Sequence, residues 1–320
     1  MIYIKKKLII CATVGAASYA GLCALIHYEI FNRKAKIPSK IYQAMQPKAD
    51  PDKPKTIDPR AQWLSEQDFI EYRIENDDSQ SLFAQFLPAQ EKSHIYVLCS
   101  HGYRSRGRSE FRLMTKFYHD LGFNVLLVDH RASGDSEGNY ITFGKKESAD
   151  LLLWIDKIRN EFDADAQIIL HGVSMGAASV LMLSDKREIL PNVKFIVADC
   201  AYTSVTDEFR HNLKKAHIPS SLLIGSVDIV NRITSGFSYY EDSPSKCVID
   251  ACVPILFIHG GSDDFVPTFM SQENYEICSG EKDILIIDGA AHAESYPTDS
   301  AAYEEKVKEF ISKYLDKESD

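Results

Sequence analysis

The chain has 320 residues, 45% of them apolar and 26% charged, which is enough for one large domain or two ordinary ones with a sizeable core. The formal net charge of −10 is unevenly spread: residues 1–40 carry seven Lys and Arg against one Glu, so the rest of the chain carries −16. This acidic body argues against nucleic acid as a partner, because neutralising phosphates needs clustered Lys and Arg.

Residues 1–36 predict a membrane anchor. Three lysines at positions 5–7 precede an uncharged, proline-free run over residues 8–26. As a helix this run spans about 28 Å, close to the roughly 30 Å hydrocarbon core of a bilayer. The competing interpretation is a cleaved secretory signal, with small residues Ser18 and Ala20 before the cut. Because the apolar run continues past Ala20, the pattern favours an uncleaved signal anchor with a single transmembrane helix.

The charges that flank this run give opposing signals about orientation. The lysines at positions 5–7 favour a cytoplasmic N-terminus, whereas Arg33, Lys34, Lys36 and Lys40 favour the reverse. The body holds five cysteines without metal-ligand spacing, so at least one thiol is free, which favours a reducing compartment. We expect a cell-membrane protein whose body lies on the extracellular side.

A proline-rich linker follows over residues 37–59. Five of the 12 prolines fall within it, among Lys and Asp. This composition predicts an extended spacer, which would hold the body off the membrane. The folded domain is then residues 60–320.

Strand-like and helical segments alternate along this domain. The expected strands are 69–74, 82–87, 95–100, 124–129, 167–172, 194–199, 254–260 and 283–288, the first two as an antiparallel pair. The expected helices are 109–121, 145–160, 175–185, 267–277 and 300–315. Continuous apolar strands that alternate with helices indicate an α/β fold, with a mostly parallel, doubly wound sheet covered on both faces.

One stretch breaks the alternation. About 54 residues separate the strand that ends at Asp199 from the strand that starts at Pro254, and they include the apolar run SLLIGSVDIV. This is too long for a simple crossover. It predicts a small helical cap, about residues 204–247, over the sheet edge where open α/β sheets bind their ligands. The alternative is one long crossover helix with a loop.

Ser174 lies at the centre of Gly172-Val173-Ser174-Met175-Gly176, which fits G-x-S-x-G between a predicted strand and a predicted helix. This context is typical of a nucleophile elbow, a turn so sharp that side chains at the two glycine positions would collide. Chance alone supplies such a motif in a chain of this length roughly one time in ten. The strand-to-helix context therefore carries more weight than the motif.

A serine is a weak nucleophile at neutral pH and needs a general base, which an orienting acid holds in place. In an elbow fold the acid and then the histidine follow the serine, each in a loop after a strand. His292 follows the strand 283–288 and is the only histidine after residue 263. This order predicts His292 as the base.

Several residues are candidates for the acid. Asp263 and Asp264 follow the strand 254–260, and Asp199 ends an earlier strand, whereas Asp129 and Asp135 precede the serine. Asp263 is preferred, with Asp264 solvated or capping the next helix.

An oxyanion hole needs two backbone N–H donors aimed at the developing negative charge. We expect one from Met175, directly after the nucleophile. We expect the other from Tyr103, because the His101-Gly102 turn would present its amide.

Together these segments resemble the α/β-hydrolase superfamily, and within it bacterial membrane-anchored serine hydrolases that are esterase- or peptidase-like. The resemblance covers about residues 60–316 and rests on HGY (101–103), DHRASGDSEG (129–138), HGVSMGAAS (171–179), DCAYTS (199–204), PILFIHGGSDDFVP (254–267) and AAHAESY (290–296). It implies Ser174, Asp263 and His292 as a catalytic triad, with Asp263 selected over Asp264 by its place three residues before the Val of Val-Pro. It also implies Tyr103 as an oxyanion donor.

One departure from that pattern is the basic run after Tyr103, which brings Arg104, Arg106, Arg108 and then Arg112. Arginines at a pocket mouth would bind an anionic group of the substrate. The commoner alternative is a solvated loop and helix face.

We therefore expect a serine hydrolase that cleaves carboxylic esters through an acyl-enzyme, with no metal or organic cofactor and with a small-molecule or lipid-like ester as substrate. Apolar residues of the expected cap would line an acyl pocket or contact lipid. Two alternatives stay open: peptide or amide hydrolysis on the same triad, and a catalytically silent, membrane-anchored binding module on this fold.

Overall fold

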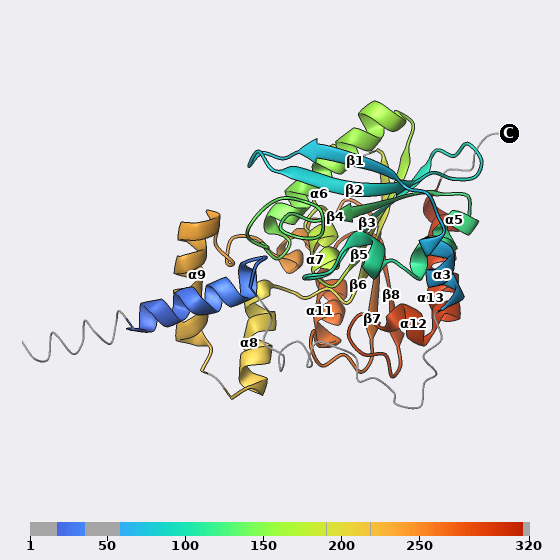
Figure 1. Ribbon diagram of the computed structural model, residues 1–320. Helices are drawn as coiled ribbons and strands as arrows, with labels where there is room; N and C mark the ends of the chain where they lie inside the picture. The colour runs from blue at the N-terminus through green and yellow to red at the C-terminus, as the bar shows by residue number, and fades with distance from the viewer. Residues whose placement is uncertain (1–17, 36–57, 190, 218, 316–320) are drawn as a thin grey trace, which may run out of the picture.

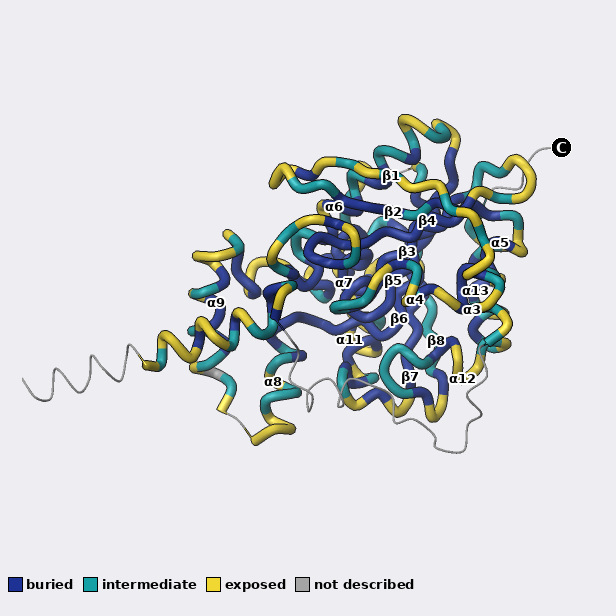
Figure 2. Tube along the Cα trace, viewed as in Figure 1, coloured by how far each residue is buried: buried dark blue, intermediate teal, exposed yellow. Residues whose placement is uncertain are grey.

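The computed structural model describes residues 18–35, 58–189, 191–217 and 219–315. In these ranges the chain forms one eight-stranded sheet with helices on both faces, and further helices project beside the sheet (Figure 1). Figure 2 shows that the central strands are buried along their length, whereas the projecting helices keep exposed stretches.

The strands of the sheet are β1 (Ile70–Glu75), β2 (Ser81–Leu87), β3 (Ile95–Ser100), β4 (Asn124–Asp129), β5 (Gln167–Val173), β6 (Val193–Asp199), β7 (Ile255–Gly260) and β8 (Lys282–Ile287). Their order across the sheet is β1-β2-β4-β3-β5-β6-β7-β8. β2 pairs antiparallel with β1 and β4, and all later pairs are parallel. The predicted α/β class is confirmed, and each predicted strand lies within one residue of the observed one.

The helices that cover the sheet are α3 (Pro59–Ser65), α4 (Gly107–Glu110), α5 (Met114–Asp120), α6 (Lys145–Lys157), α7 (Met175–Leu181), α10 (Pro244–Val248), α11 (Phe269–Ile277), α12 (Ser295–Thr298) and α13 (Ser300–Tyr314). The segment expected as one helix over 109–121 is in fact two, α4 and α5, because Phe111 ends the first with non-helical backbone (φ −89°, ψ 16°). A π-helical turn, Ile158–Phe162, ends the segment expected at 145–160.

Alternate residues of the central strands contribute to two separate cores. Leu98, Leu126 and Leu170 join one core with residues of α6 and α7. The neighbouring residues Val97, Val125 and Ile169 join the other core with residues of α5 and α13. This two-residue period with both faces covered accounts for the continuous apolar runs in the sequence.

The expected cap segment, about 204–247, contains α8 (Val205–Lys215) and α9 (Ser221–Ser235). Figure 1 shows both helices projecting from the body, with α8 nearer to it and α9 farther out. A third aromatic-rich cluster joins them to the body, with Phe143 and Met175 on the body side and Val205, Phe209 and Val227 on the helices.

Residues 18–31 form a helix that lies against α9 (Figure 1). The Tyr19 hydroxyl donates to Ser226 Oγ at 3.2 Å, and His27 Nε2 lies 3.2 Å from Asn231 Oδ1. Among the helices of the described residues, none has the length and apolar character needed to cross a membrane. The predicted span, 8–26, lies outside the described residues up to position 17.

The membrane anchor and its orientation stay predictions. The predicted linker, 37–59, also lies outside the described residues, except for its last two. Asp58 caps α3 by accepting a hydrogen bond from Arg60 N at 2.8 Å.

Candidate active site

Ser174 lies at the tip of a sharp turn between β5 and α7. Its backbone has φ 56° and ψ −118°, in a region that residues with side chains rarely occupy. A Cβ added to Gly172 would lie 2.3 Å from Gly176 O, and one added to Gly176 would lie 1.9 Å from Ser100 O. Both glycines are therefore required by close approach of the backbone, as the elbow interpretation assumed.

His292 lies in the loop after β8, at the same edge of the sheet. Its Nε2 is 2.9 Å from Ser174 Oγ, and its Nδ1 is 2.7 Å from Asp263 Oδ2. Because the carboxylate accepts, Nδ1 carries the proton, and Nε2 is left to accept from the serine hydroxyl. The structure thus brings together the three residues that the sequence selected, in the hydrogen-bonded order serine, histidine, aspartate.

Asp263 follows β7 and is held by backbone as well as side-chain donors. Its Oδ1 accepts from the N–H groups of Phe265 and Val266, each at 3.0 Å. Burial alone would raise the pKa of Asp263, but hydrogen bonds and charge from His259 and His292 lower it well below the usual value. The carboxylate is therefore ionised at neutral pH.

Two of the other candidate acids bind groups other than His292. Asp264 is exposed and pairs with Lys215 at 2.7 Å. Asp199 is buried and accepts from Ser295 Oγ at 3.0 Å, and desolvation raises its pKa to about 6.

Opposing effects act on the pKa of His292, the candidate base. Burial lowers the pKa of His292, but the hydrogen bond and charge of Asp263, with smaller contributions from Glu208 and Glu110, raise it above the usual value. Glu208, on α8, is itself buried, and desolvation raises its pKa to about 7. No sequence pattern marks Glu208, because a glutamate on an amphipathic helix is ordinarily solvated.

The two expected oxyanion donors lie on either side of the serine. Met175 is the first residue of α7, where backbone N–H groups have no partner within the helix. Tyr103 lies in the loop after β3. That loop runs next to the nucleophile, since a Cβ on Gly102 would lie 3.3 Å from Ser174 Cβ.

Ser174 and His292 open into a groove of about 510 Å³. Apolar side chains of Leu113, Met114 and Phe265 line part of it, and Arg104, Arg106 and Arg112 line another part. We call this the catalytic groove.

The arginines after Tyr103 have partners within the protein. Arg106 Nη1 lies 3.6 Å from Asp135 Oδ2, and Arg112 donates to Ser109 O at 3.2 Å. Arg108 donates to Leu64 O at 3.0 Å. Arg104 donates to backbone carbonyls of residues 29–35, which we call the N-terminal segment. Arg104 and Arg108 therefore have structural contacts, whereas Arg106 and Arg112 are exposed along the groove.

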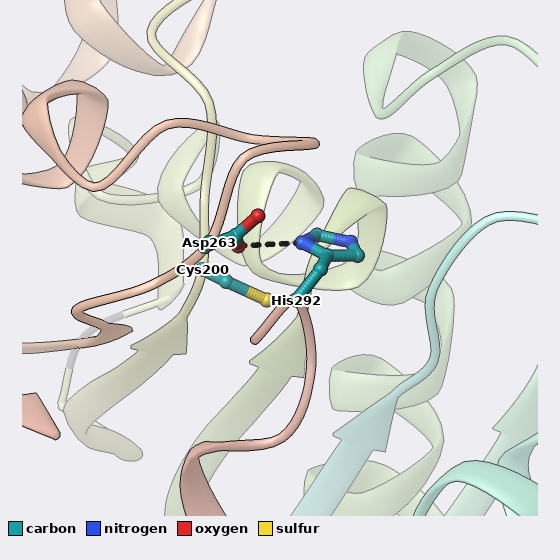
Figure 3. A group of neighbouring side chains, drawn as sticks. All are labelled: Cys200, Asp263 and His292. Carbon is teal, nitrogen blue, oxygen red and sulfur yellow. Dashed lines mark hydrogen bonds and ion pairs between the residues drawn. The ribbon is translucent and has the colours of Figure 1, made fainter. Parts of the chain in front are cut away.

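Cys200 lies beside the His292–Asp263 pair (Figure 3). Its sulfur and one ligand atom of each partner lie within 4.8 Å of one another. Desolvation raises the pKa of this buried thiol well above its usual value, so it is not a thiolate at neutral pH. His292 Nδ1 and Asp263 Oδ2 are hydrogen-bonded to each other at 2.7 Å.

The chain was compared with protein-family models, with curated proteins and with solved structures. No protein-family model matches the chain. An uncharacterized protein of Bacillus subtilis, YqkD, is 29% identical over 221 residues, which cover 69% of this chain and 72% of the relative.

Two solved structures resemble the chain over most of its length. The esterase Pf2001 of Pyrococcus furiosus superposes with a TM-score of 0.65 and 22% identity, covering 82% of this chain and 97% of the esterase. The α/β hydrolase GrgF from Penicillium sp. sh18 superposes with a TM-score of 0.62 and 16% identity, covering 78% and 99%. The expected resemblance is confirmed for the fold.

Proposed function

We propose that this chain, which has the α/β-hydrolase fold, is a serine hydrolase that cleaves carboxylic esters through an acyl-enzyme. The observation that carries the proposal is the continuous hydrogen-bonded series from Ser174 through His292 to Asp263, with separations of 2.9 and 2.7 Å. The esterase activity named for a structural neighbour supports the choice of ester as substrate.

The reaction follows from this series. Ser174 Oγ attacks the ester carbonyl carbon as its proton passes to His292 Nε2, and Asp263 stabilises the imidazolium that forms. The amides of Tyr103 and Met175 bind the tetrahedral oxyanion. The alcohol leaves with the proton from His292. A water molecule, deprotonated by the same nitrogen, then attacks the acyl-enzyme and releases the acid.

The substrate is a small-molecule or lipid-like ester. The catalytic groove supports this, because it places apolar side chains from Leu113, Met114 and Phe265 beside the nucleophile. Attachment to the cell membrane through the N-terminal uncharged run, with the catalytic domain outside, belongs to the same proposal. Its support is the sequence alone. Extraction of the full chain into alkaline carbonate would contradict membrane spanning.

A fluorophosphonate probe tests the proposal, since it reacts with serines that a neighbouring base activates. Wild-type protein should label, Ser174→Ala should not, and the control Cys200→Ala should label like wild type. Folded wild-type protein that fails to label would contradict the hydrolase proposal and leave the silent binding module. Among active proteins, a panel of nitrophenyl esters and peptide anilides separates esterase from peptidase, and we expect the esters to be turned over faster.

A further inference from the structure

Arg104 joins the active-site loop to the end of the N-terminal helix. Its guanidinium donates from Nη2 to Glu29 O at 2.9 Å and to Asn32 O at 3.0 Å, and from Nη1 to Ala35 O. Its Nε donates to the Tyr103 hydroxyl at 2.8 Å. Nearly all N–H groups of this side chain therefore donate to the Tyr103 hydroxyl or to backbone carbonyls of residues 29–35.

These acceptors are a natural target for an arginine. The helix over 18–31 ends here, and the last carbonyls of a helix have no partner within it. A cation at this end also interacts favourably with the helix dipole. A lysine could not replace Arg104, because an ammonium lacks the planar fork that reaches several acceptors at once.

The Tyr103 side chain makes a second connection to the same segment. Its hydroxyl donates to Ile30 O, and its ring stacks on Phe143 with 5.1 Å between centroids. Both side chains that follow Gly102 are thus fixed by contacts with residues at least 40 positions away. One of these two residues, Tyr103, also carries the backbone amide assigned to the oxyanion hole.

The backbone at Arg104 adopts a strained conformation in this arrangement. Its φ of 56° lies in the left-handed region, which is unfavourable for a residue with a side chain. Such a conformation persists only where surrounding contacts stabilise it. Here the guanidinium contacts supply that stabilisation, so their loss frees the loop to relax.

The N-terminal segment is itself firmly docked. Phe31 is completely buried, stacked on Tyr239 with 5.0 Å between ring centroids, and its carbonyl accepts from Ile141 N at 2.8 Å. Arg33 donates to Gly134 O and Ser136 O at 2.8 and 2.6 Å. The segment can therefore serve as a fixed support.

We propose that residues 29–35 position the oxyanion hole, and that Arg104 is the positioning residue through which they act. The N-terminal segment is then a working part of the active site as well as a candidate anchor. This inference rests on the proposed serine hydrolase function. Loss of the Arg104 contacts should therefore weaken binding of the transition state, because misplacing a catalytic donor by about 1 Å costs on the order of 100-fold in rate.

The test compares full-length wild type with Arg104→Ala on a 4-nitrophenyl ester and its thionoester. An oxyanion hole favours the oxygen compound, since sulfur is larger and a weaker hydrogen-bond acceptor. We expect Arg104→Ala to lower kcat for the ester roughly 10- to 100-fold, with KM changed less than about threefold. We also expect the ester-to-thionoester rate ratio to fall.

A milder variant covers the case in which Arg104→Ala does not fold. Tyr103→Phe removes only the hydroxyl bound to Ile30 O and should lower kcat and the same ratio by a smaller factor. Arg108→Ala is the matched control, because Arg108 donates to Leu64 O and lies over the Phe69 ring, away from residues 29–35. It should keep kcat and the ratio of wild type.

The inference fails if both variants fold and keep the wild-type kcat, or if kcat falls with an unchanged ester-to-thionoester ratio. Neither result affects the proposed function as long as the wild type labels with fluorophosphonate and hydrolyses esters. A wild type that does neither contradicts the proposed function itself.

Discussion

His259, in β7, and His292, in the loop after β8, approach the same carboxylate oxygen of Asp263. His259 Nε2 lies 3.1 Å from Asp263 Oδ2, and His292 Nδ1 lies 2.7 Å from it. The other ring nitrogen of His259 lies 2.6 Å from Ser271 Oγ, and the whole side chain is buried. With two backbone donors on Oδ1, the carboxylate can neither rotate nor take a proton easily.

The first prediction separates the two adjacent aspartates. Asp263→Asn should lower kcat for a nitrophenyl ester by about 10³- to 10⁴-fold, because an amide in this place stabilises the wrong His292 tautomer; the corresponding change in another serine hydrolase costs about 10⁴. Asp264→Asn is the matched control and should keep the wild-type kcat, since Asp264 pairs with Lys215 at the surface. Equal losses in both variants would contradict the assignment of the acid.

The second prediction concerns pH. In the proposed mechanism neutral His292 is the base, so kcat/KM should rise with pH through the pKa of this histidine in the free enzyme. Since Asp263 raises that pKa despite burial, the midpoint should lie above the usual value of 6.5. Profiles from pH 5 to 9 should show the midpoint moving down in Asp263→Asn, measured on the residual activity. A midpoint that stays in place would mean that Asp263 does not act on the base.

The third prediction concerns the buried Glu208. Its pKa is about 7 in the folded protein against an ordinary 4.5, so the folded state binds the proton more tightly and stability falls as pH rises between these values. Glu208→Gln should thus be more stable than wild type at pH 8, by up to about 3 kcal/mol, and similar to it near pH 4.5.

Urea unfolding at the two pH values measures this difference. The exposed Glu273 on α11 supplies the control, because Glu273→Gln should change the free energy of unfolding by less than about 0.5 kcal/mol at both. A Glu208→Gln protein with no pH-dependent gain would show that the carboxyl is solvated in solution.

The fourth prediction concerns glycines. Gly176→Ala should prevent folding or cost several kcal/mol, because the new Cβ would lie 1.9 Å from Ser100 O, a backbone atom that cannot move aside. Gly225→Ala, in α9 with nothing within 4 Å of the new Cβ, should instead stabilise the protein by roughly 0.5–1 kcal/mol. Thermal melts of both variants provide the comparison, and a tolerated Gly176→Ala would contradict the elbow geometry.

The fifth prediction tests whether the N-terminal segment belongs to the fold. Phe31→Ala should lower the free energy of unfolding by about 3–5 kcal/mol, since Phe31 is completely buried among aromatic rings. Leu25→Ala, on the same helix but 55% exposed, should change it by less than about 0.5 kcal/mol. If both changes are neutral, the helix does not dock on the catalytic domain in solution.

The sheet and the triad were open to prediction because their signals are local. A strand buried on both faces has an unbroken apolar run in its sequence. Because Ser174, Asp263 and His292 each follow such a strand, their order along the chain predicts that they meet at one edge of the sheet. The elbow glycines add a steric signal that depends only on neighbouring backbone.

The surroundings of the triad could not be predicted in the same way. The sequence predicts that Arg104 is either solvated or bound to an anion, yet its partners are backbone carbonyls about 70 positions earlier. Every residue has a backbone carbonyl, so no sequence pattern identifies these acceptors. His259 stood within the segment that pointed to Asp263, but only its distance from the carboxylate reveals its role. The docking of Phe31 depends on aromatic residues from three distant segments.

Docking of the N-terminal segment bears on the spacer role predicted for the proline-rich stretch. The segments on both sides of residues 36–57 contact the catalytic domain. Before this stretch, Phe31 is buried and Asn32 O accepts from Arg104, and after it the chain forms α3. Because the segments on either side of it both contact the catalytic domain, the length of this stretch does not set how far those two segments lie from each other. Lengthening or shortening it would therefore leave the distance between the catalytic groove and anything bound to the N-terminal helix unchanged.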